Sequence, residues 1–309
     1  MKNRIRIIRP ASREKEDLLS DKLKQFEKIG FITDFEDIPI DPSWGYSSGS
    51  QENRASALEA ALFSKEAQLI LAARGGYGCS DLLPLIDFQK FEHEDLSLII
   101  GFSDISALHS AFYTKLGWPS LHAPMPATAL WDFEAKDVAS LICLMNDFSQ
   151  GKILRQSLSV KLIPTESISR VSQKNPALKG KLFGGCFSVL TNMIGTPYFP
   201  KDLSNHIIFI EDLQENPARL LRYLNQWIQS GAFEKATALV VGYLKDMGEG
   251  VEDNAEFVLR EIAKRCAIPV FHSKDFGHIT PNTPLLIGSD ATIKGNELVW
   301  TFDPRRNQS

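Results

Sequence analysis

The clearest hydrophobic pattern in the chain is an apolar run followed by a polar turn and then a helical repeat. Residues 96–100 are almost continuously apolar, which is typical of a parallel strand covered on both faces. Apolar residues recur at helical spacing over 107–112. Ser103 lies in the turn between them, at the carboxyl edge of the predicted sheet, where α/β proteins bind ligands. The first N–H groups of a helix are free to stabilise a negative oxygen, so Ser103 is a candidate nucleophile.

A second interpretation of Ser103 stays open at this point. Serine at a strand-to-helix junction is typical of a plain helix cap. The esterase pattern G-x-S-x-G is incomplete here, because Ile105 occupies the place of its second glycine. A nucleophile therefore needs partners from elsewhere in the chain.

The same alternation of strand and helix patterns runs through the first half of the sequence. Apolar runs predict strands at 5–8, 68–73 and 119–124, and helical repeats predict helices at 12–29, capped by Ser12, and at 54–63. This order predicts an α/β fold with a doubly wound parallel sheet over residues 1–146. Residues 147–178 are richer in Ser, Gln and Lys and predict a linker with one strand at 159–163.

A smaller second α/β domain is predicted over residues 179–309. A glycine-rich stretch at 180–188 leads into an apolar helix, and a strand pair at 287–302 turns near Gly295. Between them the pattern predicts strands at 207–210, 238–244 and 270–272 and helices at 216–227 and 254–267.

Composition narrows the classes of function. The chain has 309 residues and a net charge of −4, which gives no basic footprint for nucleic acid. No apolar run approaches the roughly 20 residues that a membrane span needs, and the charged start does not resemble a signal peptide. The four cysteines lack metal-ligand spacing and are expected to be reduced core residues. We therefore expect a cytoplasmic protein without nucleic-acid or membrane partners.

The glycine-rich segment Arg74–Gly78 follows a predicted strand and has three explanations. A dinucleotide site is weakly supported, because Asp81 holds the third glycine position of G-x-G-x-x-G. A peptide N–H aimed at an oxyanion is the second explanation, and a tight turn without a ligand is the third.

Partners for Ser103 are sought among histidines and acids, because a serine hydroxyl needs a base held by a carboxylate. His278 follows Gly277 in a turn-rich loop, which favours an exposed, positioned imidazole, although a surface histidine is the alternative. Glu211 ends an apolar strand, and Asp212 competes with it. The order Ser103, Glu211, His278 is that of α/β-hydrolases. The other histidines are expected to be structural (His109), exposed (His93, His206), within a strand (His272) or near the cleft (His122).

Together these segments resemble the LD-carboxypeptidase family of serine peptidases, which includes muramoyltetrapeptide carboxypeptidase and the microcin C self-immunity peptidase. The resemblance covers nearly the whole chain, and several motifs follow one another in the family's order. The matching segments are 41–46, 49–54, 73–78 with 82–84, 101–109, 122–125, 180–185, 195–196, 211–212 and 277–278. Ala123 and Cys186 depart from the family's usual residues.

The resemblance implies a role for each candidate. Ser103 is the expected nucleophile, His278 the base and Glu211 the residue that orients it, with the backbone amides of Gly76 and Asp104 as the oxyanion hole. It also implies an N-terminal flavodoxin-like domain with the nucleophile and a C-terminal domain with the acid and base. No metal ion or other cofactor is implied.

The expected reaction is removal of the terminal D-alanine from a murein tetrapeptide by cleavage of an LD peptide bond. Arg74 is the candidate for binding the terminal carboxylate, with a structural ion pair as its alternative. Two other functions stay open: the same chemistry on a peptide-nucleotide antibiotic, and a non-catalytic ligand-binding protein. A homodimer also stays open.

Overall fold

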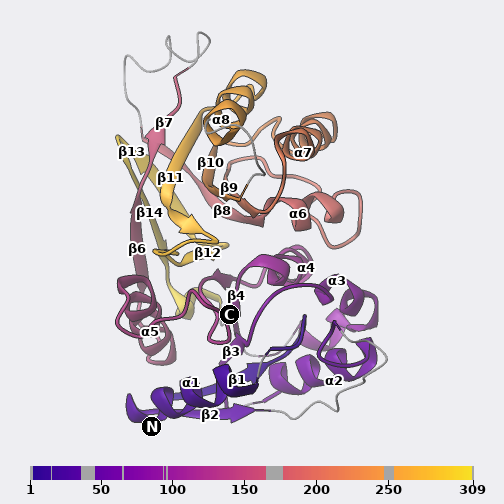
Figure 1. Ribbon diagram of the computed structural model, residues 1–309, viewed down its shortest axis with the longest axis vertical. Helices are drawn as coiled ribbons and strands as arrows, with labels where there is room; N and C mark the ends of the chain where they lie inside the picture. Colours follow the sequence, from indigo (N-terminus) through magenta and orange to yellow (C-terminus); the bar gives the residue numbers. More distant parts are fainter. Residues whose placement is uncertain are drawn as a thin grey trace.

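The computed structural model describes residues 3–14, 16–35, 46–64, 66–92, 94, 97–164, 177–246 and 254–307. Within these residues the chain forms two sheets, and Figure 1 shows the halves that contain them stacked along the long axis of the molecule. The predicted loop at 41–50 lies outside the described residues up to residue 45, as does His93.

The first sheet is the predicted doubly wound one. Its strand order is β12-β5-β4-β3-β1-β2, and the pairs from β2 through β5 are all parallel. The order β2-β1-β3-β4-β5 is that of flavodoxin-like folds, so this part of the fold prediction is confirmed. Its elements are β1 (Asn3–Ile8), α1 (Glu16–Lys28), β2 (Phe31–Phe35), α2 (Gln51–Leu62), β3 (Leu69–Ala72), α3 (Cys79–Leu82), β4 (Leu98–Gly101), α4 (Ser106–Leu116) and β5 (Ser120–His122).

The second sheet has the order β6-β14-β13-β8-β9-β10-β11-β7 and is mixed, with parallel strands β8 to β11 at its centre. Helices alternate with these central strands, which confirms a second α/β unit. Its elements are β6 (Leu154–Ser159), β7 (Lys161–Leu162), β8 (Leu178–Cys186), α6 (Phe187–Met193), β9 (His206–Leu213), α7 (Pro217–Gln229), β10 (Ala238–Lys245), α8 (Asn254–Arg265), β11 (Val270–Gly277), β13 (Asp290–Lys294) and β14 (Glu297–Phe302).

One strand crosses between the two halves. After β11 the chain returns to the first sheet, where β12 (Leu285–Ile287) pairs antiparallel with β5. The chain then turns back to the second sheet as β13. Residues 278–284, between β11 and β12, are therefore tied to both sheets.

The second half also docks directly on α4. The N–H of Cys186 donates to the Ser106 hydroxyl (2.9 Å), and the Ser110 hydroxyl donates to the carbonyl of Tyr198 (2.7 Å). A Cβ added to Gly185 would lie only 2.4 Å from Ser106 Oγ, so a glycine allows this approach. The helix that follows Ser103 is thus part of the interface between the halves.

Several local predictions were wrong. Helix α5 (Lys136–Ser149) was missed, although its buried positions Val138, Leu141, Met145 and Phe148 have helical spacing. The predicted linker supplies β6 and β7 to the second sheet, because pairing with β14 and β11 satisfies its backbone. Ser12 lies in an isolated bridge with Ser47 rather than next to α1. Cys143 is exposed, unlike the other three cysteines, and all four are free thiols.

Candidate active site

Ser103 occupies a strained turn at the end of β4. Its φ of +62° lies in the left-handed region, which is uncommon for a residue with a side chain. A short 3₁₀ turn (Ser103–Ile105) then leads into α4. A Cβ added to Gly101 would lie 2.9 Å from Ile105 Cγ1, so the sharp bend requires a glycine there. The chain therefore makes a nucleophile-elbow type of turn without the second glycine of the sequence pattern.

The glycine-rich loop after β3 lies against this turn. A Cβ added to Gly75 would lie 3.0 Å from Ser103 Cβ and 3.4 Å from the backbone nitrogen of Asp104. Gly76 has a φ of +117° and packs on Ser12, whose hydroxyl accepts a hydrogen bond from the N–H of Tyr77 (3.0 Å). Residues 74–78 are thus a tight turn placed beside Ser103.

Asp104 ties the two segments together through its side chain. Its carboxylate is buried and accepts a hydrogen bond from the N–H of Cys79 (2.9 Å). Burial raises the pKa of this carboxyl, although the Cys79 bonds oppose the shift. The two amides predicted for the oxyanion hole, those of Gly76 and Asp104, therefore belong to segments that are fixed to each other.

Glu211 and His278 form a direct pair. Glu211 lies near the end of β9 and is fully buried, and its Oε2 is 2.6 Å from His278 Nδ1. His278 follows β11 and its side chain is only 11% exposed, so the prediction of an exposed imidazole was wrong. Burial excludes water from the hydrogen bond between the imidazole and the carboxylate, and this bond is stronger in surroundings of low dielectric constant.

The two partners shift each other's pKa. Burial lowers the pKa of His278, but the charge of Glu211 and the hydrogen bond to it outweigh burial, and the net pKa is raised above 6.5. Burial raises the pKa of Glu211, but His278 outweighs this effect and the net pKa is lowered. The pair is therefore stabilised as imidazolium and carboxylate, which is the state that forms when a base takes a proton from serine.

The imidazole of His278 packs against Phe102, which belongs to the same turn as Ser103. The rings of His278 and Phe102 have centroids 4.7 Å apart, and Phe102 directly precedes Ser103. The structure thus brings the three predicted side chains to one region, with Ser103 from the first half and the pair from the second. The backbone carbonyl of Ser103 accepts a hydrogen bond from the N–H of Ser106, but the Ser103 hydroxyl has no hydrogen-bond partner among the described residues. Catalytic hydrogen bonds are often long or poorly aligned until substrate binds.

Asp212, which competed with Glu211 in the sequence, has a different environment. Its carboxylate accepts from the N–H of Ser188 (2.8 Å) and from the Ser188 hydroxyl (3.2 Å), at the start of α6. Burial, followed by the charge of Glu211, raises the pKa of Asp212 to about 6. Glu211 contacts the imidazole and Asp212 caps a helix, so the geometry separates the two acids.

Three further histidines have structural surroundings, and of these His122 lies near enough to the Glu211–His278 pair for their charges to act on its pKa. His122 is fully buried between Phe102 and Phe209 and does not line a cleft, and burial lowers its pKa to about 4. His109 is buried with Nε2 bonded to the carbonyl of Gly101, as expected of a structural residue. His206 was expected to be exposed but bonds the Tyr113 hydroxyl (2.7 Å) between the halves.

Arg74 has a backbone partner in this structure. Its Nη1 donates to the carbonyl of Arg13 (3.0 Å), and its Nε is buried without a partner among the described residues. The guanidinium is therefore held beside the glycine-rich loop. Arg74 thus stays near the Ser103 turn, and its contact with a substrate stays a prediction.

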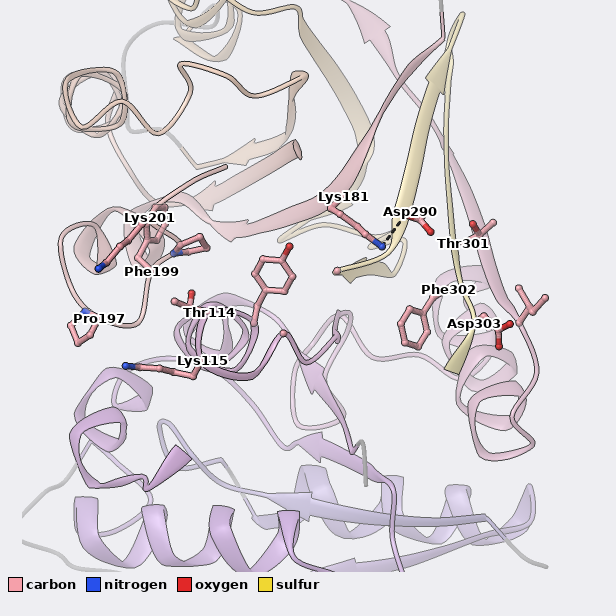
Figure 2. Close-up of a pocket in the computed structure, with 15 residues that line it drawn as sticks. Thr114, Lys115, Lys181, Pro197, Phe199, Lys201, Asp290, Thr301, Phe302 and Asp303 are labelled. Carbon is pink, nitrogen blue, oxygen red and sulfur yellow. Dashed lines mark ion pairs between the residues drawn. The ribbon is translucent and has the colours of Figure 1, made fainter. Parts of the chain in front are cut away.

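A cavity of about 950 Å³ lies elsewhere between the two halves (Figure 2). Its lining includes Lys115 and Lys201, and Lys181 in an ion pair with Asp290 (2.8 Å). Ser103, Glu211 and His278 do not line it. This cavity is therefore separate from the candidate site, which is identified by the arrangement of its side chains.

Two models of one protein family match most of this chain. The model of the LD-carboxypeptidase N-terminal domain matches residues 5–123, and that of the LD-carboxypeptidase C-terminal domain matches residues 179–293. The chain belongs to the LD-carboxypeptidase family. Membership supports a serine-type peptidase. The two matched regions contain Ser103 and the Glu211–His278 pair, respectively.

Relatives of this LD-carboxypeptidase family member extend over most of the chain. The murein tetrapeptide carboxypeptidase of Pseudomonas aeruginosa is 29% identical, with 96% of this chain and 95% of that protein covered. A putative carboxypeptidase of Rickettsia prowazekii is 32% identical over 80% of this chain and 74% of its own length. The crystal structure of muramoyltetrapeptide carboxypeptidase from Oxalobacter formigenes has a TM-score of 0.79 at 25% identity, with 97% and 98% of the two chains covered.

The microcin C7 self-immunity protein MccF shares the fold as well. Its structure has a TM-score of 0.79 at 20% identity, with 98% of this chain and 96% of that chain covered. In the part of the chain that the structure describes, no helix is both long and apolar enough to cross a membrane.

Sequence reasoning missed several residues that build the site. Gly75 lies against Ser103, and Ser12 contacts the same loop at Gly76 and Tyr77. The pair of adjacent glycines was visible in the sequence, but nothing in it showed which of them faces the serine. The contact of Ser12 joins segments 65 residues apart, so only the folded chain reveals it.

Proposed function

We propose that this protein is a serine LD-carboxypeptidase that releases the terminal D-alanine from murein tetrapeptides. The observation that carries the proposal is the buried Glu211–His278 pair, packed through Phe102 on the strained Ser103 turn. The relative from Pseudomonas aeruginosa, named a murein tetrapeptide carboxypeptidase, supports this substrate class.

The reaction follows the serine peptidase scheme. Ser103 Oγ attacks the carbonyl carbon of the last peptide bond while Nε2 of His278 takes the hydroxyl proton. Glu211 accepts the Nδ1–H of His278 and stabilises the imidazolium. The C–N bond then breaks, His278 gives its proton to the amine of D-alanine, and a Ser103 ester remains. Water activated by His278 hydrolyses this ester and releases the tripeptide.

Two further groups in this scheme bind negative charge on the substrate: one stabilises the oxyanion and the other binds the terminal carboxylate. The amides of Gly76 and Asp104 donate to the tetrahedral oxyanion, and loss of one such donor costs on the order of 3 kcal/mol of barrier. Arg74 binds the terminal carboxylate of the substrate, which gives the enzyme its exopeptidase character.

The proposal also includes a cytoplasmic location and a role in cell-wall recycling. The free cysteines agree with a reducing compartment. The alternative substrate is a peptide-nucleotide amide of the kind cleaved in microcin C immunity. This alternative is supported only by the shared fold with MccF, a structure of which is described as a complex with aspartyl sulfamoyl adenosine.

The test is an assay of purified protein with three substrates: the tetrapeptide L-Ala-γ-D-Glu-meso-diaminopimelate-D-Ala, a DD-linked pentapeptide and aspartyl sulfamoyl adenosine. We expect loss of one alanine from the tetrapeptide alone. Ser103→Ala is expected to lower the rate at least about 10⁴-fold, because the nucleophile is lost. Ser149→Ala on α5 is the matched control and is expected to keep the wild-type rate.

Each other outcome excludes part of the proposal. Turnover of the adenosine compound alone would identify the microcin-type substrate. No turnover of any substrate would favour a binding protein, and an unchanged rate in Ser103→Ala would exclude Ser103 as the nucleophile.

A further inference from the structure

The loop that carries His278 is held by a buried side chain that the reaction scheme does not use. This loop (residues 278–284) connects β11 of the second sheet to β12 of the first. Asn282 is fully buried in it, and its Oδ1 accepts a hydrogen bond from the N–H of Gly277 (3.1 Å). Gly277 directly precedes His278, so Asn282 fixes the backbone from which the imidazole projects.

Asn282 is in turn held by Asp137 on α5. The N–H of Asn282 donates to Asp137 Oδ2 (2.6 Å), and Asp137 is only 3% exposed. Helix α5 lies outside both matched family regions, between residues 123 and 179. Moving a carboxylate out of water costs free energy, and one hydrogen bond from a backbone N–H offsets only part of that desolvation cost. This contact therefore needs an explanation beyond packing.

The unbonded atoms of the same two residues are complementary. Asp137 Oδ1 and Asn282 Nδ2 are both buried and have no hydrogen-bond partner among the described residues. One is an acceptor and the other a donor, so one water between them would satisfy both. The observed bond from the Asn282 N–H to the Asp137 carboxylate is thus the contact that ties the loop to α5.

We propose that Asp137 and Asn282 are positioning residues that hold the His278 imidazole in its productive orientation. Glu211 fixes the ring at Nδ1, and the chain Asp137–Asn282–Gly277 fixes the backbone at the other end of the side chain. With both ends held, Nε2 keeps one direction relative to the Ser103 turn. This inference rests on the proposed peptidase function for its kinetic consequences.

The role proposed for Asp137 is positional and differs from that of Glu211. After burial, the strongest influences on the pKa of His278 are Glu211, Asp212 and Lys245. Replacing Asp137 is therefore expected to move the imidazole without moving its pKa. That difference separates a positioning residue from a charged partner.

The kinetic experiment compares Asp137→Leu with Asp137→Asn. Leucine removes the acceptor for the Asn282 N–H, whereas asparagine keeps an acceptor oxygen. We expect Asp137→Leu to lower kcat about 100-fold, as a small misplacement of a reacting group does, with KM for the tetrapeptide within about twofold of wild type. Asp137→Asn is expected to retain most of kcat, and the acid limb of the pH profile should not move in either variant.

The matched control is Asp147→Leu, on the same helix, where the side chain is 41% exposed and pairs with Lys152. It is expected to leave kcat and KM unchanged. Thermal unfolding of each variant shows whether it folds. Where Asp137→Leu does not fold, Asn282→Ala, which removes the acceptor for Gly277, takes its place in every measurement.

A second measurement needs no substrate. The proton shared by His278 Nδ1 and Glu211 gives a far-downfield proton NMR signal. This signal is expected to keep its position but broaden in Asp137→Leu, because the loop is held less firmly, and to stay sharp in Asp137→Asn. If the wild-type protein cleaves no peptide but the signal responds this way, the positioning stands and only the proposed function fails. An unchanged signal with unchanged kcat in Asp137→Leu overturns the inference, as does a failure of Asp137→Asn to restore kcat.

Discussion

Single residues at this site have functions that depend on small differences in surroundings. Glu211 and Asp212 are adjacent acids at the end of one strand, yet Glu211 bonds His278 and Asp212 caps α6. Strand alternation sends their side chains to opposite faces, which separates the two roles. The Ser103 backbone shows a similar dependence, because its positive φ is sustained by neighbours rather than by its own preference.

The pair predicts a specific pH response for Glu211→Gln. His278 acts as a base only when neutral, so activity is lost as pH falls through its pKa, which lies above 6.5 in the wild type. Without the Glu211 charge, burial dominates and the pKa falls, so the acid limb of kcat/KM should move to lower pH. The rate itself should drop on the order of 10³- to 10⁴-fold, because glutamine can hold the wrong tautomer.

A graded control exists in Asp212→Asn. Asp212 also raises the pKa of His278, more weakly than Glu211 does. Its replacement should move the acid limb in the same direction by less, with little loss of rate at high pH. An acid limb that stays in place in Glu211→Gln would contradict the account of the pair given above.

At the scale of elements, the site is a meeting of two turns and one crossing loop. The turn after β4 carries Ser103, the turn after β3 packs on it through Gly75, and the loop after β11 brings His278. The ends of adjacent parallel strands lie at one edge of the first sheet, so the first two turns are neighbours by topology. The third arrives only because β12 returns to the first sheet.

Contact between the two turns predicts a selective effect of Gly75→Ala. The added methyl would lie 3.0 Å from Ser103 Cβ and 3.2 Å from Oγ, so the serine must move. We expect kcat to fall about 100-fold with little change in melting temperature. Gly151→Ala is a control with the opposite pattern. The φ of Gly151 is +64°, which strains a residue with a side chain, but no atom lies within 4 Å of an added Cβ. The free energy of unfolding should therefore fall by about 1 kcal/mol while kcat stays at the wild-type value. Equal activity in Gly75→Ala and wild type would show that the turns are not in functional contact.

At the scale of the whole molecule, buried histidines couple stability to pH. Burial lowers the pKa of His109 to about 3 and that of His122 to about 4. The unfolded chain binds protons at these residues below about pH 6.5 and the folded chain does not. Their contribution to stability is therefore full above that pH and is lost as pH falls toward the folded values.

The change His122→Phe tests this linkage. Both ring nitrogens of His122 are buried without partners among the described residues, and its neighbours Phe102 and Phe209 already form an aromatic cluster. The histidine costs the folded state roughly 2 kcal/mol at pH 5, so the drop in unfolding free energy between pH 7.5 and pH 5 should shrink by about that amount. Urea unfolding at the two pH values measures it, and an equal drop in variant and wild type would refute the prediction.

Local patterns were sufficient for most of the fold. Apolar runs and helical repeats predicted a doubly wound parallel sheet, because these signals depend on residues close in sequence. They predicted the strand pair that turns near Gly295 for the same reason. The family resemblance implied the flavodoxin-like kind of the first sheet, and strand β2 of this sheet was not predicted. Helix α5 was missed because polar residues such as Asp137 and Asn146 interrupt its apolar face.

The sequence by itself determined which residues could carry the chemistry: a serine at a strand end, an acid at another, and a histidine in a loop. Only the tertiary structure decided that Glu211 rather than Asp212 contacts the imidazole, that Gly75 faces the serine, and that Asp137 holds the loop of His278. Such contacts join residues 28 to 145 positions apart in the sequence. Short-range periodicity contains no information about these distances, because they are set by how the two sheets cross and pack.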